Sequence, residues 1–330
     1  MQTRPSLSVG LLVYNGEQFI EKAIRSILNQ TFNDFELLIS DNASTDKTQE
    51  ICREFAASDP RVRYFRAATN MGAGWNAQRV YSLATGKYYR QAAHDDFCEP
   101  TYFERAIDIL EADSGVVLAY SKTRVVDQNG SFLEDYECEM RLDSVDPLAR
   151  FADLITVGHR CYPIYGVIRM ETLRCIPMQG IFAHSDRIHL AELGLQGRFH
   201  EIPERLFIST THMRQSSWAM PERSLKKRFR LTKRPGALPN IGWWDPNRKR
   251  AVTFPEWNAL RQYAAVILRS SLDKRQKLQA FGALARRTAI YRRRLMGDVV
   301  IAADQLIYNF QTRKEYRLEQ QQLQEAEGRG

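Results

Sequence analysis

Short apolar runs alternate with segments of helical spacing along the first 120 residues, and this alternation limits the chain to a small group of folds. We predict strands at Leu7–Val13, Phe35–Ser40, Val62–Phe65, Lys87–Ala92 and Val116–Tyr120. Helical segments separate them, and such connections are typical of right-handed crossovers between parallel strands. The chain is therefore predicted to be an α/β protein with a mixed, mostly parallel sheet flanked by helices.

The pattern changes after Tyr120. Asn129-Gly130 is a strong hairpin signal, and Ile202–Ser209 is predicted to be a late strand. Proline and basic residues become frequent from Pro221, and the pattern is helical again from Trp257. We divide the chain into a domain of residues 1–220, with halves 1–120 and 121–220, and a basic, helical C-terminal extension of residues 221–330.

The net charge of +8 is unevenly distributed. Residues 1–150 hold 16 basic and 23 acidic side chains, whereas the residues after position 220 hold 24 basic and 10 acidic ones. A basic block of this kind indicates an anionic partner, such as a phosphate-rich molecule or a membrane surface.

Several classes of protein are excluded. No stretch approaches the roughly 18 apolar residues of a membrane-spanning helix, and the apolar run Leu7–Tyr14 is too short for a signal peptide. The five cysteines are odd in number and form no CxxC pair, which argues against a disulfide framework and a zinc ribbon. We expect a protein of the reducing cytoplasm.

Polar clusters follow three of the predicted strands, namely Tyr14-Asn15, Ser40-Asp41-Asn42 and His94-Asp95-Asp96. Ligands of open parallel sheets bind beyond the carboxyl ends of the strands, so these clusters form a candidate site. The adjacent carboxylates Asp95 and Asp96 repel each other, and Mg²⁺ or Mn²⁺ would relieve that repulsion. A solvated acidic pair that caps a helix is the alternative.

Residues 6–120 resemble the nucleotide-sugar-binding half of a bacterial-type, inverting family 2 glycosyltransferase with the GT-A fold. The matching segments, in order along the chain, are Ser8–Gly16, Ser26–Phe32, Asp41–Asp46, Asn70-Met71-Gly72 with Asn76, Ala84–Tyr88 and His94-Asp95-Asp96. Each segment is weakly specific alone, but six in the correct order and spacing are highly specific.

The resemblance implies a role for each matching residue of the nucleotide site. Asp41 would hydrogen-bond the nucleotide base, and Tyr14 and Asn15 would pack beside the base and ribose. The nucleotide and diphosphate region would be lined by Asn70, Gly72 and Asn76.

The resemblance also implies a metal site. Asp95 and Asp96 would form a DxD-type motif, with Asp96 the direct ligand of Mn²⁺ or Mg²⁺ on the donor diphosphate. The fuller family motif has an acid two residues before Asp95, where this chain has Ala93, so the site would hold one carboxylate fewer.

The second half resembles the family more loosely. Asp186 matches the catalytic carboxylate of inverting members, although Ser185 stands where a glutamate is usual. As general base it would deprotonate the acceptor hydroxyl; a helix cap is the alternative. His212 would contact the metal or the diphosphate, or serve structure alone, and Arg214 would neutralise the departing diphosphate.

The C-terminal extension leaves alternatives open. Trp243 and Trp244 could stack on a sugar ring or clasp the connector to the core. The helix after Arg286 carries an apolar stripe from Tyr291 to Phe310 beside clustered arginines. It could pack on its own domain or on a second subunit of a homo-oligomer, or lie on an anionic membrane surface.

We therefore expect a metal-dependent hexosyltransferase (EC 2.4) that moves a sugar, with inversion, from a UDP-sugar to a hydroxyl of a glycan or lipid-linked acceptor. Bacterial polysaccharide or cell-envelope glycan synthesis, at the cytoplasmic face of the membrane, is the expected setting. A nucleotidyltransferase would need a glycine-rich, basic loop after the first strand, where this chain has Glu17. A non-enzymatic nucleic-acid-binding protein would need a recognition motif, and none is found.

Overall fold

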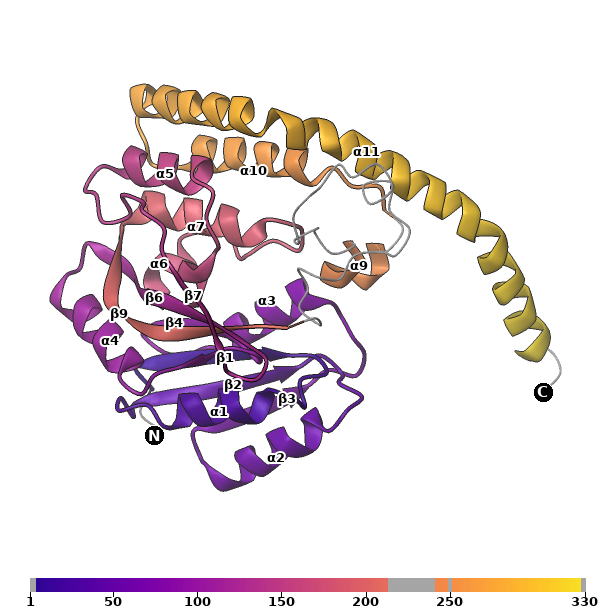
Figure 1. Cartoon of the computed structure of the whole chain (residues 1–330), viewed down its shortest axis with the longest axis horizontal. Coiled ribbons are helices and arrows are strands. Elements are labelled where there is room, and N and C mark those ends of the chain that lie inside the picture. Colours follow the sequence, from indigo (N-terminus) through magenta and orange to yellow (C-terminus); the bar gives the residue numbers. More distant parts are fainter. Residues whose placement is uncertain (1–3, 213–240, 249–250, 328–330) are drawn as a thin grey trace.

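The computed structural model describes residues 4–212, 241–248 and 251–327. A nine-stranded sheet lies at its centre, in the order β3-β2-β1-β4-β8-β6-β9-β5 with β7 beside β6 (Figure 1). The strands are β1 Leu7–Val13, β2 Phe35–Asp41, β3 Val62–Arg66, β4 Tyr88–Ala93, β5 Phe97–Cys98, β6 Val116–Asp127, β7 Phe132–Tyr136, β8 Val167–Arg169 and β9 Arg198–Thr211. The helices are α1 Ile20–Leu28, α2 Thr48–Ser58, α3 Ala73–Leu83, α4 Tyr102–Ala112, α5 Pro147–Thr156, η1 Tyr162–Tyr165, α6 Met170–Arg174, α7 Ser185–Gln196, α9 Ile241–Trp244, η3 Pro246–Arg248, α10 Pro255–Arg269 and α11 Lys274–Glu327.

The first four strands are parallel to one another. β1 pairs with both β2 and β4, and β2 pairs with β3. All seven residues of β2 are buried, including the polar Glu36, Ser40 and Asp41, and its centre Leu37–Ile39 is apolar. The register places Val13 opposite Asp41 and Leu12 opposite Ala93, so the polar residues that follow these strands emerge at one edge.

The second half of the sheet is mixed. β8 runs antiparallel to β4 and β6, whereas β9 runs parallel to β6 along almost its whole length. The predicted hairpin is confirmed, because Gly130 takes a positive φ of 85° in the turn between β6 and β7. The end of β9 pairs with β5 through Ile208 and Phe207, and this pairing brings the residues after β9 beside those after β4.

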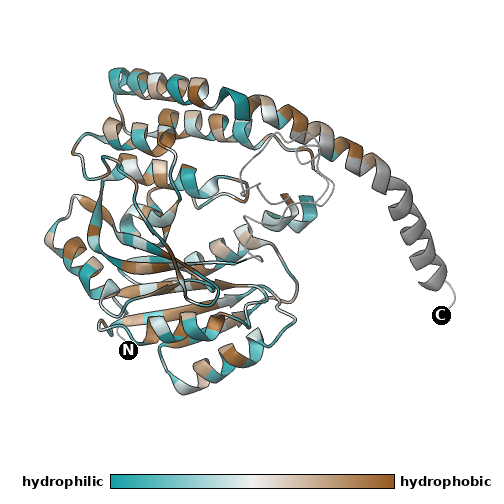
Figure 2. Ribbon diagram, viewed as in Figure 1, coloured by the Kyte–Doolittle hydropathy of each residue, from teal (hydrophilic) through white to brown (hydrophobic). Residues whose placement is uncertain are grey.

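Two apolar cores cover the sheet. One contains Ile24 of α1 and Phe103 of α4, packed against the buried face of the parallel strands. The other contains Phe151 of α5 and Leu190 of α7, and it also includes Tyr263 and its neighbours from α10. The C-terminal helices therefore share a core with the sheet-flanking helices; Figure 2 shows the apolar residues on the facing sides.

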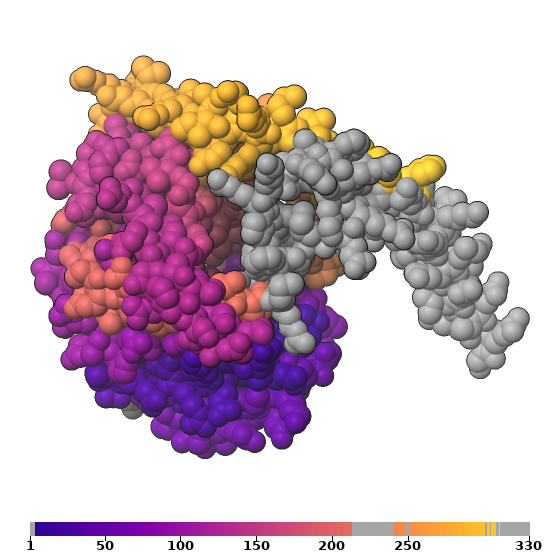
Figure 3. Space-filling model, in the orientation of Figure 1, coloured from indigo at the N-terminus to yellow at the C-terminus, as the bar shows by residue number. Residues whose placement is uncertain are grey.

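α10 and α11 cover α5 and α7 (Figures 1 and 3), and α11 then extends beyond the body of the molecule (Figure 1). Arg269 of α10 donates two hydrogen bonds of 2.5 Å to Glu192 of α7, which fixes one end of this layer. The predicted apolar stripe of α11 is only partly buried. Leu295 is buried, whereas the side chains of Val299 and Phe310 are 54% and 80% exposed. The predicted boundary at residue 220 lies outside the described residues.

None of the helices in the described part of the chain combines the length and the apolar composition needed to cross a membrane.

Candidate functional site

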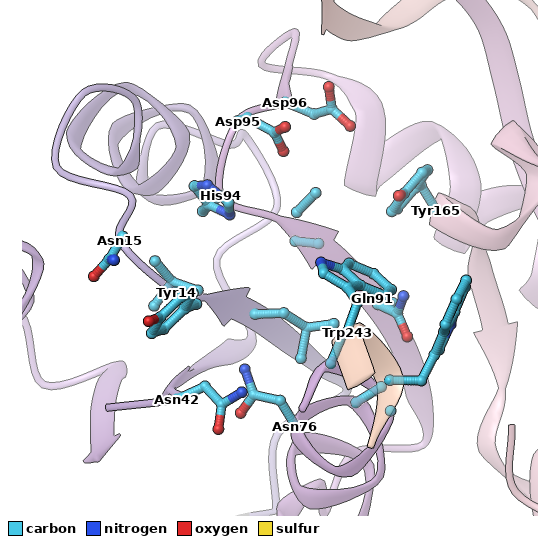
Figure 4. Close-up of a pocket in the computed structure, with 18 of the residues that line it drawn as sticks. Tyr14, Asn15, Asn42, Asn76, Gln91, His94, Asp95, Asp96, Tyr165 and Trp243 are labelled. Atoms are coloured by element: carbon cyan, nitrogen blue, oxygen red, sulfur yellow. The ribbon is translucent and has the colours of Figure 1, made fainter. Parts of the chain in front are cut away.

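A cavity of about 1080 Å³ opens at the edge of the sheet where β1, β4 and β9 end. Its walls come from segments far apart in the sequence, including the start of α3, the start of α7 and the short helix α9. Figure 4 shows Tyr14, Asn42 and Asn76 toward one end of this cavity and Asp95 and Asp96 toward the other. The predicted residues that line it are Tyr14, Asn15, Asn70, Asn76, Asp95, Asp96 and His212.

The turn after β1 presents Tyr14 to the cavity, and its side chain is 44% exposed. Asn15 adopts a left-handed conformation with a φ of 51°. Its side-chain oxygen accepts a hydrogen bond of 2.8 Å from the amide of Thr45, and its own amide donates one of 2.9 Å to the hydroxyl of Ser44. The two strand ends are thereby tied together, and the Tyr14 ring is held at the cavity wall.

Asp41 is fully buried at the end of β2 and is not among the residues that line the cavity. One carboxylate oxygen accepts a hydrogen bond of 2.6 Å from the hydroxyl of Tyr64, and the other accepts one of 2.8 Å from the amide of Ser44. The guanidinium of Arg66 lies 3.5 Å away. Burial, followed by the hydrogen bond to Asp41, raises the pKa of Tyr64. Both carboxylate oxygens of Asp41 are thus hydrogen-bonded within the protein, at the place where Asp41 is predicted to contact the nucleotide base.

Asn70 and Asn42 form a second corner of the site. The side-chain amide of Asn42 donates a hydrogen bond of 2.9 Å to the side-chain oxygen of Asn70, which also accepts one of 2.9 Å from the amide of Gly72. Gly72 itself is not a lining residue. Its φ is 86°, and a side chain there would collide with the carbonyl oxygen of Trp244, so the close approach of α9 requires glycine.

Asn76 lines the cavity from α3 but is only 3% exposed. Its side chain accepts a hydrogen bond of 2.6 Å from the Ser40 hydroxyl and donates one of 2.9 Å to the Ser40 carbonyl. Asn76 therefore joins α3 to the end of β2.

The acidic pair after β4 meets the residues after β9. The Nε2 atom of His212 lies 2.9 Å from a carboxylate oxygen of Asp95, and the amide of Thr210 donates a hydrogen bond of 2.9 Å to Asp96. The His212 ring lies against Phe19, with 4.6 Å between ring centres. This contact joins positions more than a hundred residues apart, and the pairing of the end of β9 with β5, which directly follows the acidic pair, brings them together.

The pKa values of the Asp95 and Asp96 carboxyl groups are shifted in opposite directions. Burial opposes the charge of Asp95, but the hydrogen bond from His212 and the nearby imidazole of His94 outweigh it and lower its pKa. Burial, followed by the charge of Asp95, raises the pKa of Asp96 well above its usual range. A cation bound beside the pair would favour the charged form of both groups.

The three predicted metal ligands are Asp95, Asp96 and His212. The structure brings all three to one wall of the cavity and places Asp95 and His212 in direct contact. Within the described ranges, no three His, Cys, Asp or Glu side chains are already arranged around a common point that could hold a metal ion.

Asp186 lies in the first turn of α7, where its carboxylate accepts a hydrogen bond of 2.8 Å from the amide of Arg187. It is half-buried and does not line the cavity, whereas the preceding Ser185 does. Burial, followed by the charge of Asp186, raises the pKa of the Cys161 thiol well above its usual range. Arg214, predicted to neutralise the diphosphate, lies outside the residues that the structure describes.

The polar and aromatic residues of the cavity wall that the sequence does not predict include Gln91, Arg160, Tyr162 and Tyr165. Gln91 lies inside a strand, and the other three lie around the single turn η1, where no periodicity marks them. The Arg160 guanidinium donates a hydrogen bond of 3.1 Å to the Tyr162 hydroxyl and forms an ion pair with Glu134. It is thus already partnered at the cavity wall.

Comparison with known proteins supports the resemblance noted in the sequence. Residues 8–162 match the family model described as Glycosyl transferase family 2. The chondroitin synthase of Escherichia coli is 34% identical over 131 residues, which are 40% of this chain and 19% of that protein. Glycosyltransferase MJ1057 of Methanocaldococcus jannaschii is 30% identical over 138 residues, or 41% of this chain and 48% of that protein. The chain therefore spans less than half the length of these two relatives.

The fold is also found among solved structures. TarS 1–349 of S. aureus in complex with UDP superposes with a TM-score of 0.60, at 15% identity, over 86% of this chain and 71% of that one. The complex of the same protein with UDP-GlcNAc gives 0.60 at 16% identity, over 86% and 72%. The predicted fold, a GT-A type sheet flanked by helices with a helical C-terminal region, is confirmed.

Proposed function

We propose, proceeding from the membership of residues 8–162 in glycosyl transferase family 2, that this protein is an inverting glycosyltransferase. It would move a sugar from a nucleoside-diphosphate sugar, of the UDP-sugar class, to a hydroxyl of a glycan or lipid-linked acceptor. Polysaccharide or cell-envelope glycan synthesis is the proposed setting, and the chondroitin synthase named above supports it. The observation that carries the proposal is that seven of the predicted site residues line one cavity.

The size of this cavity supports a large, polar substrate. Ligand pockets commonly measure about 300–1,000 Å³, so a cavity of about 1080 Å³ has room for a nucleotide sugar and part of an acceptor. The amide and hydroxyl groups near Tyr14, Asn42 and Asn70 supply hydrogen-bonding partners for a base and ribose.

The residues at the acidic end suit a divalent cation. Two carboxylates and an imidazole are oxygen and nitrogen donors that Mn²⁺ and Mg²⁺ accept. Burial and the charge of Asp95 raise the pKa of Asp96, and a cation beside the pair would offset the repulsion between the two carboxylates. We propose that Asp95, Asp96 and His212 would hold such an ion. When bound, it would supply Lewis-acid stabilisation of the leaving diphosphate.

Asp186 is the proposed general base. The acceptor oxygen would attack the anomeric carbon as the bond from that carbon to the diphosphate oxygen breaks, and the acceptor proton would pass to the Asp186 carboxylate. Attack opposite the leaving group inverts the configuration at the anomeric carbon. Asp186 follows directly after Ser185, which lines the cavity, and both lie in the first turn of α7.

Thermal-shift measurements with UDP-, GDP- and dTDP-sugars, with and without Mn²⁺, test donor binding. We expect stabilisation by a UDP-sugar that increases with Mn²⁺. Asp96→Asn should remove the Mn²⁺-dependent part, and Asp186→Asn should leave donor binding intact while transfer collapses. Asp108→Asn, an exposed change on α4, is the matched control. Wild-type-like transfer by both site variants would contradict the assignment of the residues, and no response to any nucleotide sugar would contradict the function.

We also propose that the outer face of α11 contacts an anionic membrane surface. Exposed basic residues lie along this helix, and Asp298, its sole acidic residue between positions 274 and 303, is buried. Exposed apolar side chains accompany them, among them Met296, Val299 and Phe310. Apolar residues flanked by arginine suit a helix at the lipid headgroups, where each basic residue contributes on the order of 1 kcal/mol.

Sedimentation with lipid vesicles tests this contact. The protein should sediment together with vesicles that contain phosphatidylglycerol. With vesicles of pure phosphatidylcholine it should remain in the supernatant. The double variant Arg292→Glu with Arg293→Glu should lose binding, and Arg53→Glu on the exposed side of α2 should not. Equal binding by the double variant and the control would contradict the proposal.

A further inference from the structure

The short helix α9 carries two adjacent tryptophans whose surroundings differ. Trp244 is 9% exposed, whereas Trp243 is 44% exposed, and their rings meet edge to face with 5.0 Å between ring centres. The sequence leaves open whether the pair clasps the connector to the core or serves as a binding surface. The structure separates the two functions, because one indole is buried and the other is open.

Trp244 anchors α9 to the body. Its carbonyl oxygen lies so close to Gly72 that any side chain at position 72 would collide with it. The turn after the helix is closed by hydrogen bonds of 3.0 Å from the Asp245 amide to the Ile241 carbonyl and from the Asn247 amide to the Asp245 carboxylate. A backbone-to-backbone contact of this kind fixes where α9 lies relative to the Asn70 corner of the cavity.

Trp243 extends from this anchor into the cavity wall. Figure 4 shows Trp243 and Gln91 overlapping in this view of the cavity. The cavity is also lined by the polar groups of Gln91, Asp95 and Ser185. An open indole face beside hydrogen-bonding groups matches a pyranose, which has an apolar C–H face and hydroxyls around its rim.

We propose that Trp243 is the stacking surface for a pyranose ring in this cavity, and this inference rests on the proposed glycosyl transfer. The ring would belong to the donor sugar or to the acceptor sugar that receives it.

Calorimetry with two matched ligands tests the donor source. UDP and UDP-N-acetylglucosamine differ by the sugar alone. If the donor sugar stacks on Trp243, Trp243→Ala should weaken binding of UDP-N-acetylglucosamine at least tenfold, leave the affinity for UDP within twofold, and be largely rescued by Trp243→Phe. Trp257→Phe is the control, because Trp257 is 49% exposed on α10 and does not line the cavity.

The acceptor source is tested with N,N′-diacetylchitobiose in the presence of UDP. Here Trp243→Ala should abolish disaccharide binding without changing either nucleotide affinity, and Trp243→Phe should restore it. The inference is overturned if Trp243→Ala changes neither sugar-dependent affinity, or if it weakens UDP as much as UDP-N-acetylglucosamine, since the latter reports a collapsed wall. Failure of the wild-type protein to bind any nucleotide would instead overturn the proposed function together with this inference.

Discussion

Glu256 is the centre of a buried charge cluster that joins the C-terminal helices to the start of α7, and its neutralisation should destabilise the protein strongly. The side chain is 7% exposed and accepts a hydrogen bond of 3.0 Å from Arg287, which is itself buried. His184 lies 3.4 Å from it, and Arg294 lies 3.9 Å away. Glu256→Gln keeps the shape of the side chain but leaves the Arg287 guanidinium without its counter-ion.

The magnitude follows from the pKa of this group. Burial opposes the charge of Glu256, but the hydrogen bond and charge of His184, followed by those of Arg287, outweigh it and lower the pKa from 4.5 to about 2. At about 1.4 kcal/mol for each pKa unit, that difference corresponds to roughly 3 kcal/mol of stability at neutral pH. Breaking a buried ion pair typically costs about 3–5 kcal/mol, so we expect a loss of at least about 3 kcal/mol.

Thermal and urea unfolding of the wild type and of Glu256→Gln measure this loss. The control is Glu111→Gln, which removes an ion pair with Lys87 whose side chains are 56% and 53% exposed, and which should cost less than about 1 kcal/mol. Because the pKa of Glu256 is lowered on folding, its contribution is complete above pH 4.5 and is lost as the pH falls toward 2. The two proteins should therefore converge in stability with acidification. A cost no larger than that of Glu111→Gln, or a difference independent of pH, would refute this reasoning.

Three further substitutions test other parts of the structure. Gly72→Ala should cost about 1–3 kcal/mol in thermal unfolding and displace α9, because the φ of 86° and the Trp244 carbonyl both exclude a side chain. Asn76→Ala should cost about 1–3 kcal/mol in urea unfolding, since it removes the two hydrogen bonds between Asn76 and the buried Ser40. Glu36→Gln should also destabilise, and its effect should fade as the pH falls below 4.5, because the pKa of Glu36 is lowered: burial opposes its charge, but hydrogen bonds outweigh it. A loss of stability at position 36 that grows on acidification would contradict that sign.

Much of the first half of the fold could be predicted from the sequence. The predicted strands Leu7–Val13 and Phe35–Ser40 coincide with β1 and nearly with β2, because strands buried on both faces are rich in apolar residues. The strands β5 and β8 could not be predicted. Each has two or three residues, too few for any periodicity, and both exist only because longer strands pair with them.

The candidate site, too, could be predicted only in part from the sequence. Tyr14, Asn15 and Asp95 could be placed at the sheet edge because they directly follow recognisable strands. The contact between Asp95 and His212 could not be derived, since it depends on the pairing of the end of β9 with β5, a strand of only two residues. Asp186 could be placed at a helix start, but whether its carboxylate faces the cavity depends on the packing of α7, which local sequence does not determine.

The scattered origin of the cavity wall has a consequence for synthesis of the chain. The pairings among β1, β2, β3 and β4 are complete within the first 93 residues, so this part of the sheet can form while the rest is being translated. The wall also needs Ser185, His212 and Trp243, and the last of these is made after almost three quarters of the chain. A nascent or truncated chain that ends at residue 162 would hold the whole family-matching segment without a closed cavity. The growing polypeptide thus has no finished site to occupy with substrate until its C-terminal third has emerged and packed.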